Sequence, residues 1–126
     1  MLKPIKLPHD DGSKLRSFVK SWALLREAKG DDLMPIQHFD ISANENDELN
    51  LKFPMNSADY SATVTVFEIA DRTLKLQLKW KIKDAPSYKK IETYELTLSE
   101  DGRNLTGFYN QQTIDGLDLT RAVWGE

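Results

Sequence analysis

Strict alternation of apolar and polar side chains marks residues 73–83 as an extended segment. Leu74, Leu76, Leu78, Trp80 and Ile82 alternate with polar positions, most of them lysines. Successive side chains of a β-strand point to opposite faces, whereas a helix would scatter these lysines around its axis. The pattern therefore predicts a strand with one face in a core and the other in water.

The rest of the chain after residue 33 predicts six more strands of this kind. Together the seven strands cover residues 36–43, 48–53, 60–69, 73–83, 90–98, 104–110 and 117–124. A change of phase at Phe67 predicts a β-bulge or burial on both faces. Gly102 occupies a hairpin position that favours positive φ. Because the connections are short, each strand is expected to lie antiparallel to the next.

The stretch before residue 30 fits two predictions. Its apolar positions recur at helical spacing, and Gly30 could end a helix that runs through residue 28. The alternative is a short helix to about Phe18, a strand over 20–27 and a hairpin turn at 29–32. We favour the strand, because a first strand that pairs with the last one removes both free edges of the sheet.

These elements predict one mainly β domain over residues 1–126, with 1–12 as an extended N-terminal arm. The fold expected is an antiparallel up-and-down meander of seven to eight strands that closes into a barrel, preceded by a short N-terminal helix. Closure follows from the alternation, since an open sheet this wide would leave its apolar face in water.

The order of the elements resembles the calycin superfamily, the lipocalin-like small β-barrels. In that family a Gly-x-Trp motif lies on the first strand, and an arginine near the end of the last strand packs across the tryptophan. The matching segments here are Lys20-Ser21-Trp22 and Leu119-Thr120-Arg121, with Lys20 in place of the glycine. The resemblance implies a contact between Trp22 and Arg121, and the late hairpin from Tyr94 through Gly107 is also similar to that of lipocalin-like domains.

Composition excludes several classes of function. The chain has 17 basic and 20 acidic residues, so it lacks the basic surface of a nucleic-acid-binding protein. It has no cysteine, which rules out disulfides and thiol chemistry. We see no signal peptide and no membrane span, so a cytoplasmic protein without membrane partners is expected. A homodimer is compatible with the sequence.

No metal or catalytic motif is present. Two histidines, His9 and His38, are too few for a site, even with neighbouring aspartates, and we expect neither a metal nor another cofactor. The lysines of 75–83 are expected to pair with Glu92 and Glu95 across the sheet. If Glu92 instead faced inward it could act as an acid or base, but a solvated position at the barrel rim near Ile82 is favoured. We therefore assign no catalytic residue and lean against an enzyme.

The interior remains as the candidate site. The residues expected to line it and to contact a ligand are Trp22, Leu78, Trp80, Tyr94, Leu96, Tyr109 (or its neighbour Phe108) and Arg121. Such side chains either fill a barrel or surround a cavity. The function favoured is therefore binding of a small, largely apolar ligand. Alternatives are a protein–protein interaction domain with a filled core, or a cofactor-free isomerase or cyclase that shapes its substrate.

Overall fold

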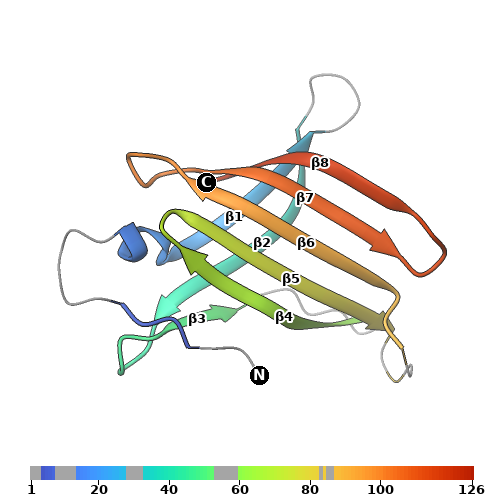
Figure 1. Ribbon diagram of the computed structural model, residues 1–126, viewed down its shortest axis with the longest axis horizontal. Helices are drawn as coiled ribbons and strands as arrows, with labels where there is room; N and C mark the ends of the chain where they lie inside the picture. The colour runs from blue at the N-terminus through green and yellow to red at the C-terminus, as the bar shows by residue number, and fades with distance from the viewer. Residues whose placement is uncertain (1–3, 8–13, 28–32, 53–59, 83, 85–86) are drawn as a thin grey trace.

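A computed structural model describes residues 4–7, 14–27, 33–52, 60–82, 84 and 87–126. Eight antiparallel strands form one curled sheet (Figure 1). Their bounds are β1 Lys20–Glu27, β2 Leu33–Ala43, β3 Leu49–Lys52, β4 Tyr60–Ala70, β5 Thr73–Ile82, β6 Lys90–Leu98, β7 Leu105–Thr113 and β8 Asp118–Gly125. The prediction of a mainly β meander is confirmed, and β1 shows that the strand alternative for 20–27 was the right one.

The predicted short N-terminal helix is not present in the described residues. A single 3-10 turn, η1 (Lys14–Phe18), takes its place directly before β1. Phe18 ends this turn with no exposed surface, and its carbonyl oxygen accepts a 3.0 Å hydrogen bond from Trp22 Nε1. The buried Phe18 side chain thus anchors the turn inside the sheet. A turn of five residues is enough to place this side chain, and a longer helix is not needed.

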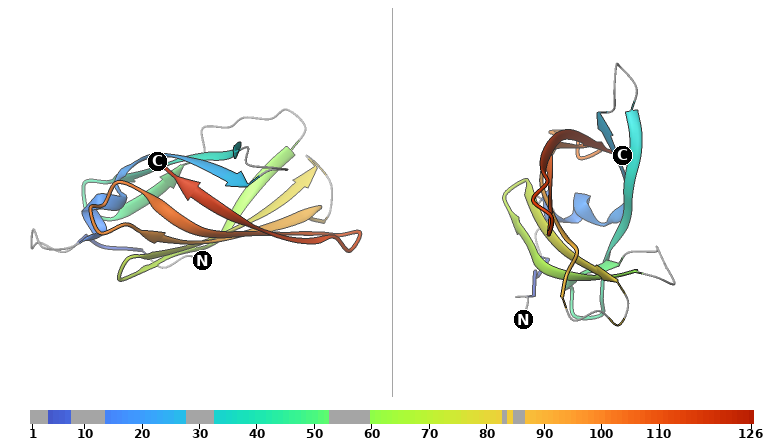
Figure 2. Two further views of the ribbon diagram at one scale, coloured as in Figure 1. Left: turned by 90° about the horizontal axis from the view of Figure 1, so that it is seen from above. Right: turned by 90° about the vertical axis from the view of Figure 1, so that its right-hand side faces the viewer.

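The sheet brings together the first and last strands of the sequence, β1 and β8. β1 lies beside β8 (Figure 2). In their register Leu24 is opposite Gly125 and Arg26 is opposite Val123. Gly125 permits this contact, because a Cβ there would lie 2.8 Å from the Leu24 side chain. In the spatial order, β3 and β4 are the two outermost strands, and no pairing joins them in the part of the chain described. The structure is therefore a curled half-barrel with a seam between β3 and β4.

The β-bulge predicted from the phase change in β4 is confirmed. The register of β4 against β5 shifts between Val64 and Val66, which lets Phe67 turn inward after Val64. Gly102 likewise has the expected positive φ, of 75°. The alternation of β5 holds as far as Trp80, but Ile82 is 45% exposed and the prediction of burial there was wrong. The pairing of β5 with β6 ends at Trp80 opposite Lys90, so β6 provides no cover for Ile82.

The core lies inside the curl and is plugged at one end, which we call the η1 end. Phe18, Trp22 and Phe39 are fully buried there, together with Leu98 and Leu105 from the β6–β7 hairpin. The opposite end, called here the far end, carries the β5–β6 and β7–β8 connections (Figure 1).

Candidate ligand-binding site

The inward face of the sheet is apolar near η1 and becomes polar toward the far end, along β6 to β8. One row of inward positions across five strands shows the change: Leu119, Gln111, Glu92, Leu78 and Val64 face one another in register. The β4 and β5 side of this row is hydrophobic, whereas β6 and β7 contribute a carboxylate and an amide. Antiparallel register places these two polar groups directly side by side.

Five residues make up this group, which we call the polar cluster: Lys90, Glu92, Tyr94, Tyr109 and Gln111. Glu92 is only 6% exposed, and it is the single buried charged residue among those described. Its Oε2 lies 3.5 Å from the Tyr94 hydroxyl and its Oε1 lies 3.8 Å from Lys90 Nζ. A buried carboxylate is costly without such partners, so these contacts account for its stability in the interior.

This position corrects the sequence prediction for Glu92. The side chain does not sit solvated at the rim near Ile82, and it does not pair with the outward lysines of β5, because in register it faces Leu78. Glu95 does lie opposite Lys75 on the outer face, as predicted. Glu92 is three positions from Glu95 along the same strand, so the two carboxylates project to opposite faces.

The two tyrosines of the cluster stack against each other and stay protonated. Their ring centroids are 5.1 Å apart. Burial, followed by the negative charge of Glu92, raises the pKa of Tyr94 well above its ordinary value. Burial and then a hydrogen bond to Glu92 raise the pKa of Tyr109 in the same direction. Tyr109 also donates a 2.6 Å hydrogen bond to Gln111 Oε1. The cluster therefore holds two neutral hydroxyl donors beside one carboxylate.

A pocket of about 380 Å³ lies next to the polar cluster at the far end. We call it the mouth pocket; its lining residues are Trp80, Lys89, Lys90, Gln111, Thr113, Ile114 and Asp115. Trp80 supplies the largest apolar surface, and Lys90 Nζ lies 5.4 Å from its ring centroid. The volume falls in the range of pockets that hold small organic molecules.

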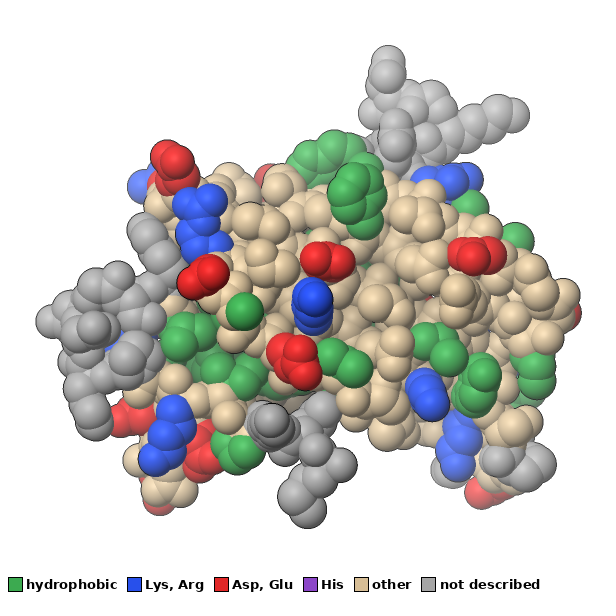
Figure 3. Space-filling model, in the orientation of Figure 1, with side chains coloured by type: hydrophobic (Ala, Val, Ile, Leu, Met, Phe, Trp, Pro, Cys, Tyr) green, Lys and Arg blue, Asp and Glu red, His purple; other side chains and the backbone are tan. Residues whose placement is uncertain are grey.

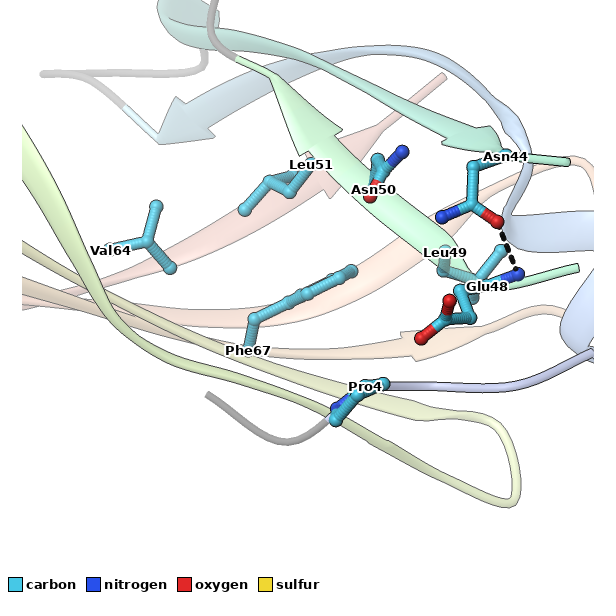
Figure 4. A pocket seen from close by; sticks show the side chains of 8 residues that line it. All are labelled: Pro4, Asn44, Glu48, Leu49, Asn50, Leu51, Val64 and Phe67. Atoms are coloured by element: carbon cyan, nitrogen blue, oxygen red, sulfur yellow. Dashed lines mark hydrogen bonds between the residues drawn. The ribbon is translucent and has the colours of Figure 1, made fainter. Parts of the chain in front are cut away.

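A second pocket, of about 300 Å³, lies in the seam between β3 and β4. Leu49 and Leu51 approach it from β3, and Val64 and Phe67 approach it from β4 (Figure 4). Asn44 orders the hairpin beside it, since its Oδ1 accepts hydrogen bonds from the backbone N–H groups of Asn46 and Glu48. The polar positions around Asn44 thus form a hairpin turn.

The residues predicted to contact a ligand divide into three groups. Trp22, Leu78, Tyr94 and Leu96 are fully buried in the core, and none of them lines either pocket. Trp80 lines the mouth pocket, and Tyr109 lies beneath it in the polar cluster. Phe108, the alternative to Tyr109, points outward and is 63% exposed. Sequence analysis missed Lys90 and Gln111, which alternation along β6 and β7 assigns to the inward face.

The predicted contact between Trp22 and Arg121 is not formed. In the register of β1 against β8, Arg26 faces Val123, so Arg121 lies about six positions along the strands from the level of Trp22. That offset corresponds to roughly 20 Å. Arg121 is exposed, and its Nη1 donates to the Thr120 carbonyl oxygen. The cation over Trp22 is Lys20, whose Nζ lies 4.5 Å from the ring centroid.

The structure groups no three potential metal ligands among the residues it describes. His38 Nε2 lies 4.0 Å from Asp40 Oδ1 on β2. His9 and its neighbouring aspartates lie outside the described residues. In the same part of the chain, no helix is long and apolar enough to cross a membrane.

Comparison with protein-family models, with curated proteins and with solved structures finds no match to this chain. The resemblance to calycins therefore stays a prediction. The chain forms an eight-stranded antiparallel half-barrel with a polar cluster and a pocket at its far end.

Proposed function

We propose that the protein binds a small, largely apolar molecule at the far end of the barrel. The observation that supports this most is the position of the mouth pocket, directly beside the buried Glu92 and its hydroxyl and ammonium partners. A pocket with an aromatic wall and a few fixed polar groups is typical of small-molecule sites. The η1 end is filled by Phe18 and Trp22, whereas the far end carries the mouth pocket.

The surface gives less support to the interaction-domain alternative. On the outer face of β5 to β8, hydrophobic side chains are scattered among charged and polar ones (Figure 3). The exposed apolar side chains there include Phe108 and Trp124. Contiguous apolar patches mark docking surfaces, whereas scattered exposed hydrophobic residues are normal.

The enzyme alternative would use Glu92 and Tyr94 as its functional groups. It would also require a substrate to bind in the mouth pocket.

Binding can be tested with an uncharged fluorescent probe, N-phenyl-1-naphthylamine. We expect a saturable rise in its fluorescence with one probe per chain. Thr113→Trp should abolish the rise, because the indole would fill the mouth pocket that Thr113 lines. Thr106→Trp is the matched control, since Thr106 is exposed on the same strand. Absence of saturable binding to the folded protein, or equal binding by Thr113→Trp, would refute the proposal.

A further inference from the structure

The hydrogen-bonding groups around the mouth pocket are not balanced between donors and acceptors. The acceptors already have partners: Glu92 is within 3.5 Å of the Tyr94 hydroxyl and 3.8 Å of Lys90 Nζ, and Gln111 Oε1 accepts from Tyr109. The Asp115 carboxylate accepts from the Thr113 hydroxyl, which lowers the pKa of Asp115. The two carboxylates and the amide oxygen around this pocket therefore already interact with protein groups before any ligand binds.

Three side chains that line the pocket carry donors that the described residues leave wholly or partly unpaired. Trp80 is 8% exposed, and its indole Nε1–H is buried with no acceptor within hydrogen-bond distance among the described residues. The NH2 group of Gln111 makes no hydrogen bond within the described part of the chain either. Lys90 carries three N–H groups and has one carboxylate, Glu92, within 4.0 Å among these residues. An unpaired buried donor is costly, so Trp80 Nε1 favours an occupant that supplies an acceptor. Gln111 and Lys90 are half-buried and add further donors at the same pocket.

We propose that the molecule bound in the mouth pocket carries a carboxylate, which accepts hydrogen bonds from Trp80 Nε1, Gln111 Nε2 and Lys90 Nζ while an apolar body packs on the Trp80 ring. A carboxylate accepts several hydrogen bonds and donates none, so it matches a wall of donors. The Lys90 ammonium strengthens the contact by its charge, and its interaction with Glu92 keeps it oriented at the pocket. This inference rests on the proposed function of the same site.

The test compares three probes that share one apolar body: 4-phenylbutanoate, its methyl ester and 4-phenylbutylamine. Isothermal titration calorimetry on the full chain should rank the acid first, roughly tenfold tighter than the ester, with the amine weakest. Added salt should weaken the acid and leave the ester nearly unchanged, because salt screens the charge of Lys90. An amine that binds as tightly as the acid would overturn the inference.

Substitutions assign the contacts. Trp80→Phe keeps an aromatic wall and removes the N–H, and it should weaken the acid by roughly three- to tenfold without affecting the amine. Trp124→Phe is its control, because Trp124 is 39% exposed and does not line the mouth pocket. Lys90→Met should remove the preference for the acid, whereas Lys81→Met on the exposed face should not. Because Lys90→Met leaves Glu92 buried without a cation, the double variant Lys90→Met/Glu92→Gln repeats the measurement with that charge removed.

The two proposals fail in different ways. If N-phenyl-1-naphthylamine binds and Thr113→Trp blocks it, but the acid shows no advantage over the ester, only the carboxylate inference is wrong. If neither the uncharged probe nor any of the three phenylbutyl probes binds, the site itself is wrong. Equal weakening of the acid by Trp80→Phe and Trp124→Phe would likewise refute the assigned contact.

Discussion

At the scale of single residues, alternation along a strand decides which side chains reach the interior. Glu92, Tyr94 and Leu96 share a face of β6, and the partner strands place Gln111, Tyr109 and Gly107 opposite them in register. Gly107, the smallest residue of this set, allows β7 to pack closely against β6. A Cβ on Gly107 would lie 1.9 Å from the Glu95 carbonyl oxygen, which belongs to the backbone and cannot rotate away.

Gly107→Ala is therefore expected to destabilise the protein by about 3 kcal/mol or more, because β6 and β7 would have to separate locally. Gly116→Ala is the matched control. Gly116 has φ of 98° but open space around its Cα, so only backbone strain of about 1–2 kcal/mol applies. Urea denaturation of both variants measures the two costs. Equal losses would show that the close approach of Gly107 to β6 does not matter.

Residue patterns also show how much of the site the sequence could reveal. The apolar side of β5 and the inward position of Trp80 follow from a period of two alone. The burial of Glu92 could be inferred from the phase of Tyr94 and Leu96, but its partners could not, because they come from other strands. The distance between Trp22 and Arg121 depends on the register of β1 against β8, which no local pattern determines.

At the scale of elements, the N-terminal segment is more than an extended arm. Lys6 forms an isolated bridge with Glu48, Leu7 N donates 2.7 Å to the Asp47 carbonyl oxygen, and Leu49 N donates 2.8 Å to the Ile5 carbonyl oxygen. Residues 5–7 thus lie antiparallel to the start of β3 and cover part of its edge. Four residues of β3 alone would leave a short edge strand with little support.

We expect Leu7→Ala to cost about 2–4 kcal/mol, because the Leu7 side chain is 5% exposed and packs in the core. Lys6→Ala should cost less than about 0.5 kcal/mol, since Lys6 is exposed. Thermal unfolding of the two variants provides the comparison. A Leu7→Ala variant as stable as Lys6→Ala would show that the segment contributes nothing to the core.

At the scale of the whole molecule, the polar cluster makes the free energy of unfolding depend on pH in the alkaline range. The pKa values of Tyr94 and Tyr109 are raised in the folded state, first by burial and then by Glu92. The unfolded chain releases these protons at about pH 10, and the folded chain retains them. The stabilising contribution is therefore complete below about pH 10 and is lost as the pH rises above it toward the folded-state pKa.

Between pH 10 and 11.5 we expect the free energy of unfolding to fall by up to about 1.4 kcal/mol per pH unit for each of Tyr94 and Tyr109, because the unfolded chain loses these protons and the folded chain retains them. The variant Tyr94→Phe/Tyr109→Phe should show a shallower slope. Tyr88→Phe is the control, because Tyr88 is exposed, and it should keep the parent slope. The slopes come from urea titrations across this pH range. A double variant with an unchanged slope would contradict the role of the cluster.

The pairing of β1 with β8 has a consequence for biosynthesis. Leu24 of β1 lies opposite Gly125 of β8, so β1 pairs with a strand that is synthesised about a hundred residues later. During translation β1 can pair with β2 as soon as both have left the ribosome, but its other side waits for the final strand. Bringing together segments so far apart in sequence is slow. The nascent chain therefore carries an uncovered β1 edge through most of its synthesis, and the pairing of β1 with β8 is expected to follow release.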